Sequence, residues 1–147
     1  LDHRQLTLRA WGADDRATPY WQRLALKTLF PLLRALIRRS FRISEAHYQK
    51  AVENIEKLLA EADERLQNDA RSLLAGDEAS YVDLQFAAMS ALWLMPAEFG
   101  GGRVAGVRIE KQNAPQPMQE DIEKWSADYP AAVTHVAKLY RDERRVQ

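Results

Sequence analysis

The segment LLAGDEASYVDLQFAAMSALWLMP, residues 73–96, decides the fold, because both a helix start and a change in polarity can be read from it. Ser80 can cap a helix by accepting a hydrogen bond from the backbone N–H of Asp83. The Asp83 carboxylate can in turn accept from the Ser80 N–H, which completes a capping box. Ala79 and Leu84 occupy the two positions of a hydrophobic staple. The segment therefore predicts a helix capped by Ser80.

The predicted helix, residues 84–95, carries no charged residue, and Gln85 and Ser90 are its only polar side chains. A helix that is apolar on nearly every face is typical of a buried position. Pro96 ends it, because proline removes a backbone donor and clashes with the preceding turn. We therefore expect a buried central helix. Replacing Asp83 with Ala should cost about 1 kcal/mol through the lost cap.

The flanking segments also predict helices. Thr18 and Pro19 open one over residues 18–41, and Ser44 caps a second. The second has an apolar stripe whose spacing alternates between four and three, which favours packing nearly parallel or antiparallel to a neighbouring helix; the stripe is Tyr48, Val52, Ile55, Leu59, Ala62 and Leu66. Two shorter helices follow, over residues 118–125 and from Pro130 onward.

These elements predict an all-α fold, a bundle of about five to six helices. Residues 1–17 are interpreted as a lead-in or linker, and residues 18–147 as one helical domain. Residues 97–117 hold four of the six glycines and two of the six prolines and form the longest irregular stretch. They predict either a disordered or packed loop or a substrate lid. The triple glycine is not a phosphate-binding loop, since no G-K-[ST] follows.

Composition excludes several classes of protein. The 147 residues include 21 basic and 21 acidic side chains, so there is no global electrostatic case for nucleic acid or an anionic membrane as partner. The absence of cysteine excludes disulfides, thiolate metal sites and a cysteine nucleophile. No apolar run is as long as a membrane span, about 18 residues. We therefore expect a cytoplasmic protein.

No catalytic motif stands out. The three histidines, His3, His47 and His135, lie in different segments, and none has a metal-ligand spacing to a second ligand. Surface or partly packed histidines are the simpler interpretation. The residues alone predict a helical bundle with no catalytic constellation, no metal site and no cofactor bound to this chain.

The capping box and the uncharged helix resemble the C-terminal all-helical domain of cytosolic, bacterial-type glutathione S-transferases. The resemblance rests on Gly76, Asp77, Ala79, Ser80, Asp83 and Leu84, and on Trp125 followed by Tyr129 and Pro130. It implies that this domain forms a pocket for a hydrophobic electrophile and part of a homodimer interface. Glutathione would be the co-substrate of the parent protein, bound by a thioredoxin-like domain that this chain lacks.

The resemblance further implies that the start of the first long helix faces the cleft between the two domains. Tyr20, Trp21, Arg23 and Lys27 are therefore the candidate substrate-binding residues, although packing in the core or an interface would account for each aromatic as well. The chain alone is not expected to be active. A second hypothesis is a non-enzymatic protein-interaction module of the same fold, and a third is an unrelated ligand-binding helical bundle.

Overall fold

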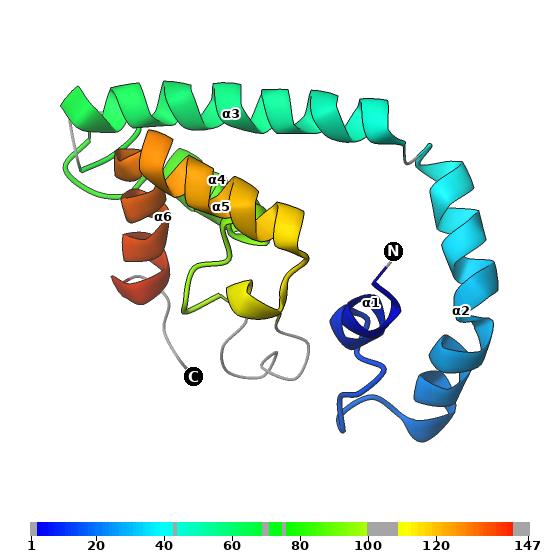
Figure 1. The fold of residues 1–147 in the computed structure, drawn as a ribbon. Coiled ribbons are helices and arrows are strands. Elements are labelled where there is room, and N and C mark those ends of the chain that lie inside the picture. The colour runs from blue at the N-terminus through cyan, green and yellow to red at the C-terminus, as the bar shows by residue number, and fades with distance from the viewer. Residues whose placement is uncertain (1–2, 43, 69–70, 75, 100–108, 143–147) are drawn as a thin grey trace. The chain divides into compact units, whose positions relative to one another are not determined.

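The protein is all-helical in the computed structural model, which describes residues 3–42, 44–68, 71–74, 76–99 and 109–142. These residues form six α-helices, a short 3-10 helix and no strand (Figure 1). In chain order they are α1 (Arg4–Ala10), α2 (Tyr20–Ser40), α3 (Glu45–Asn68), α4 (Tyr81–Leu94), η2 (Lys111–Asn113), α5 (Gln116–Asp128) and α6 (Pro130–Asp142). The expected all-α class and the position of each predicted helix are confirmed.

The chain divides into two compact units, and the boundary lies within α3, between Val52 and Glu53. The first unit contains α1, α2 and the start of α3. The second contains the rest of α3 with α4, η2, α5 and α6. The predicted limits of the helical domain, residues 18–147, stay a prediction.

A small cluster that holds α1 against α2 is the core of the first unit. Leu8, Ala13 and Phe30 are buried, and Trp11 and Leu26 pack against them. The rings of Trp11 and Phe30 lie 5.8 Å apart between centroids. Residues 1–17, interpreted as a lead-in or linker, contain the short helix α1. A helix of seven residues is too short for a helical period of apolar residues to be recognised in the sequence. The contact between Trp11 and Phe30 also joins positions that are far apart in the chain.

In the second unit α4, α5 and α6 pack on one another. Both α5 and α6 are also joined to α3, α5 by Lys124, which donates to Glu56 at 2.5 Å, and α6 by the backbone N–H of Ala132, which donates to Asp63 at 3.0 Å. The stripe predicted on α3 is confirmed where it enters this core, since Leu59, Ala62 and Leu66 are buried.

The helix expected to be buried on nearly every face is buried on one side only. Phe86, Ala87, Ala91 and Leu94 of α4 face the core, whereas Leu84 is about half exposed. Further exposed side chains on α4 are Tyr81, Val82, Met89 and Leu92. The prediction of a buried central helix is therefore confirmed for one face and wrong for the other. Lack of charge permits burial, but a helix is covered only where a neighbour packs against it.

Candidate functional site

Asp83, in the first turn of α4, is the centre of the largest buried polar cluster among the described residues. Its side chain is completely buried and accepts five hydrogen bonds. We call this cluster the Asp83 network; its donors are Ser72 Oγ at 2.8 Å, the Leu73 N–H at 2.8 Å, the Ser80 N–H at 2.8 Å, Ser80 Oγ at 2.5 Å and His135 Nε2 at 2.8 Å.

The local part of the network is the predicted capping box. Ser80 has an extended backbone and its hydroxyl accepts from the Asp83 N–H, while the Asp83 carboxylate accepts from the Ser80 N–H. Both predicted hydrogen bonds are confirmed. At its other end α4 stops where Met95 takes a left-handed conformation with φ 49°, immediately before Pro96.

The hydrogen bonds determine the charge of Asp83. Burial alone would raise the pKa of this carboxyl, because removal from water disfavours the ionised form. Bonds from Ser80, from the backbone of Leu73 and from Ser72 outweigh burial and hold the pKa of Asp83 well below its ordinary value. The network therefore contains a buried carboxylate, with His135 Nε2 donating to it from α6.

A serine, a histidine and an aspartate lie together here, but not in the order that nucleophilic catalysis needs. In a serine hydrolase the histidine lies between the serine and the aspartate, and the serine is open to substrate. Here Asp83 lies between Ser72 and His135, and Ser72 is only 1% exposed. The arrangement ties α4 to α6 and to the segment before α4, so it is structural.

A second buried carboxylate, Asp63 of α3, caps α6 from outside that helix. Its Oδ1 accepts from the Ala132 N–H at 3.0 Å, and its Oδ2 accepts from Gln67 Nε2 at 2.5 Å. Ala132 lies in the first turn of α6, where backbone N–H groups have no partner within the helix and a negative charge is favourable. Asp63 thus fixes the start of α6, the helix that carries His135.

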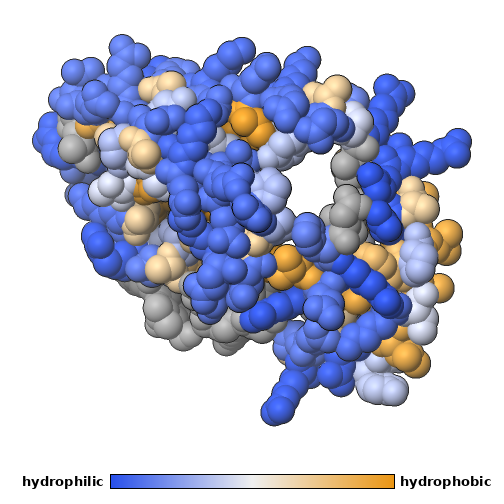
Figure 2. Space-filling view, in the orientation of Figure 1, coloured by the Kyte–Doolittle hydropathy of each residue, from blue (hydrophilic) through white to orange (hydrophobic). Residues whose placement is uncertain are grey.

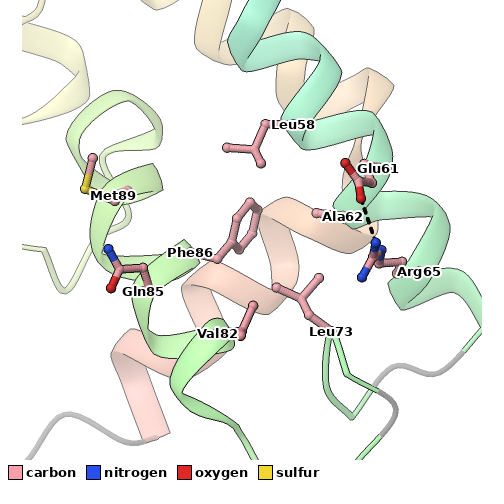
Figure 3. Close-up of a pocket in the computed structure, with 9 residues that line it drawn as sticks. All are labelled: Leu58, Glu61, Ala62, Arg65, Leu73, Val82, Gln85, Phe86 and Met89. Atoms are coloured by element: carbon pink, nitrogen blue, oxygen red, sulfur yellow. Dashed lines mark hydrogen bonds and ion pairs between the residues drawn. The ribbon is translucent and has the colours of Figure 1, made fainter.

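A pocket lies next to the Asp83 network, between α3 and α4. Its volume is about 290 Å³. Figure 3 shows the Phe86 ring among Leu58, Ala62, Leu73 and Val82, with Met89 one turn further along α4. The remaining lining residues are Glu61, Arg65 and Gln85. Glu61 and Arg65 form an ion pair at 2.6 Å, so the charges of the lining neutralise one another.

The four predicted substrate-binding residues all lie at the start of α2, in the first unit. Tyr20 and Trp21 are 73% and 67% exposed. The Arg23 guanidinium lies 5.9 Å from the centre of the Tyr20 ring, and Lys27 forms an ion pair with Asp14 at 2.8 Å. The structure thus brings Tyr20 and Arg23 together and leaves the two aromatic rings accessible to a ligand. Their role in substrate binding stays a prediction.

Other chemistry has little support among the described residues. They contain no group of three or more His, Asp or Glu side chains that could hold a metal ion. Within the same ranges, no helix has the length and apolarity that crossing a membrane requires. The glycine-rich part of the predicted loop or lid, residues 100–108, lies outside the described residues.

Sequence reasoning missed three members of the polar core, namely Ser72, His135 and Asp63. The one available signal was the position of His135 among apolar residues of the last helix, which indicates a buried histidine that needs a polar partner. Comparison with known proteins adds no assignment, since no protein-family model, no curated protein and no solved structure matches this chain.

Proposed function

We propose that this chain is the helical domain of a glutathione transferase-like protein, which binds the hydrophobic electrophile to which glutathione is conjugated. The observation that carries the proposal is the Ser80–Asp83 capping box at the start of an uncharged helix, with Asp83 tied to α6 through His135 at 2.8 Å. A capping box that opens an uncharged helix is the feature on which the resemblance to that family rests.

In this proposal the electrophile contacts the start of α2. Tyr20 and Trp21 offer exposed aromatic surface, which suits a flat apolar molecule. Arg23 and Lys27 lie on the same helix and would favour the negative charge that builds up on an electrophile when a thiolate attacks it. The thiolate itself would come from glutathione bound by another domain, so no catalytic nucleophile is assigned to this chain.

The test is glutathione-dependent conjugation of 1-chloro-2,4-dinitrobenzene by the full-length protein that contains this segment. Tyr20→Ala and Trp21→Ala should raise the KM for the electrophile and leave the KM for glutathione unchanged. Tyr81→Ala is the matched control, because Tyr81 is an equally exposed tyrosine on another helix. Absence of glutathione-dependent turnover in the unmodified protein would reject the proposal.

A second candidate, a protein-interaction module of the same fold, is favoured by the surface of α2. Figure 2 shows hydrophobic side chains gathered over this helix. Trp21, Leu24, Leu29, Leu32 and Leu36 are each at least 50% exposed. Between Tyr20 and Ser40 there is no acidic residue. An exposed apolar stripe on a helix whose charged residues are all basic suits an interface with an apolar, acidic surface.

Both candidates include a homodimer, so the oligomeric state does not separate them. Sedimentation of the wild type and of Leu32→Glu would test the interface itself, with Leu84→Glu on α4 as the control. Glutathione-dependent turnover separates the two functions, because the interaction module requires none.

A further inference from the structure

We propose that the pocket between α3 and α4 binds a small, uncharged aromatic molecule that carries one hydrogen-bonding group. Ligand pockets are mostly apolar with a few polar groups, and most range from about 300 to 1,000 Å³. At about 290 Å³ this pocket lies just below the lower limit of that range. It therefore suits a single substituted ring rather than an extended ligand.

The lining favours an aromatic ligand. Six of its side chains are apolar, and they include the Phe86 ring and the Met89 thioether. Aromatic rings pack well edge-to-face on phenylalanine, and methionine sulfur makes favourable contacts with ring edges. Leu73 and Phe86 are buried and form the inner wall, whereas Leu58 and Met89 are partly exposed and form the mouth. A ligand can thus enter between α3 and α4.

The charges of the lining favour an uncharged ligand. Arg65 and Glu61 are held together at 2.6 Å, so neither offers an uncompensated charge to a ligand ion. An ionised ligand would have to exchange water for a largely apolar wall, which is unfavourable without a charged partner. Gln85 contributes the one uncharged polar side chain of the lining. Its amide can donate to or accept from a single polar substituent.

One side of the pocket, made by Leu73 and α4, is held in place by the Asp83 network. The backbone N–H of Leu73 is fixed by Asp83 Oδ1 at 2.8 Å, which positions one wall. Phe86 follows Asp83 by three residues on α4 and therefore projects from nearly the same side of the helix. Because this side of the pocket is fixed by a buried hydrogen-bonded cluster, a ligand need not order Leu73 or Phe86, and the entropic cost of binding is reduced.

This site is separate from the electrophile site of the proposed function, which lies at the start of α2. Binding here would survive if the protein conjugated no glutathione, and glutathione conjugation would survive if nothing bound here. The two proposals therefore fail independently.

The test uses the position of the three methionines, Met89, Met95 and Met118. Met89 lines the pocket, whereas the other two do not. In protein labelled with [methyl-13C]methionine, p-cresol is the probe, and Met-to-Leu variants assign the three methyl resonances. We expect the Met89 resonance to shift saturably with p-cresol and the resonances of Met95 and Met118 to remain in place.

Two variants that fill the pocket make the test specific. Ala62→Leu places a larger side chain in the lining, and Leu58→Trp narrows the mouth without changing a buried residue. Each should raise the Kd for p-cresol about tenfold or more, which corresponds to about 1.4 kcal/mol. Ala60→Leu makes the same change at an exposed position of α3 and should leave the Kd within about twofold.

A Met89 shift that rises linearly to the solubility limit of p-cresol would overturn the proposal. So would equal shifts at all three methyl groups, or a Kd that both filling variants leave unchanged. Absence of any Met89 shift has the same consequence, because it would mean that the probe has no access to the pocket, for example because a protein segment covers it.

Discussion

Replacing Asp83 with Ala is the most informative perturbation of this protein, because it separates a local helix cap from a buried network. If Asp83 acts only within the capping box, the loss is that of one cap, about 1 kcal/mol. If the network acts as a unit, the substitution leaves buried donors of Ser72, Leu73, Ser80 and His135 without their common acceptor.

The structure supports the larger value. Leaving one buried donor without an acceptor costs about 1–3 kcal/mol, and here several donors lose the same acceptor, so a loss of about 3–5 kcal/mol is expected. Single-domain proteins are stable by about 5–15 kcal/mol, so the expected loss is a large part of the total. With a urea m-value of about 2 kcal/mol/M, it corresponds to a fall in the unfolding midpoint of roughly 1.5–2.5 M.

Urea unfolding followed by circular dichroism at 222 nm measures this difference. Asp77→Ala is a matched control, because Asp77 is an aspartate of the same segment whose side chain is 85% exposed and forms a surface ion pair with Arg71. Its free energy of unfolding should change by less than about 0.5 kcal/mol. A loss near 1 kcal/mol for Asp83→Ala would refute the network and leave only the cap.

Three further predictions follow from the same core. The free energy that Asp83 contributes should be complete above the pKa of an unfolded aspartate, about 4, and should decline as the pH falls below it toward the lower folded-state pKa. Acid titration of stability should therefore show a larger decline in the wild type than in Asp83→Asn, in which only other carboxyls such as Glu56 still contribute. Asp63→Ala should cost about 1–3 kcal/mol and speed hydrogen exchange at the start of α6, whereas the exposed neighbour substitution Glu64→Ala should do neither. Leu59→Ala should cost about 2–5 kcal/mol, and Leu58→Ala clearly less, because their exposed fractions are 0% and 42%; equal thermal shifts of the two variants would contradict the described packing of α3.

The sequence predicted what depends on residues close together in the chain. Ser80 and Asp83 are three positions apart, so one turn of helix brings them together and the capping box could be read directly. The stripe on α3 was readable for the same reason, because a helical period places Leu59, Ala62 and Leu66 on one face.

What the sequence could not provide are contacts between distant positions. His135 lies 52 residues from Asp83, and Ala132 lies 69 residues from Asp63, so no local pattern records either pair. The pocket was missed for a related reason, since its lining combines residues of α3 and α4 with Leu73 from the segment before α4. The extent to which α4 is covered also depends on neighbours, and composition gave the wrong expectation for its exposed face.

The hydrogen bonds of the Asp83 network join residues that are near and far in the chain, and this difference affects the order in which they form during folding. The bonds to Ser80 close a loop of only a few residues, whereas the bond to His135 requires α6 to be in place. Loop closure over a longer separation carries a larger entropic cost and is expected later on the pathway. Because α4 precedes α6 in the chain, α4 leaves the ribosome before His135 does during synthesis. Until α6 follows, the Asp83 carboxylate has the serines beside it and water in place of the imidazole.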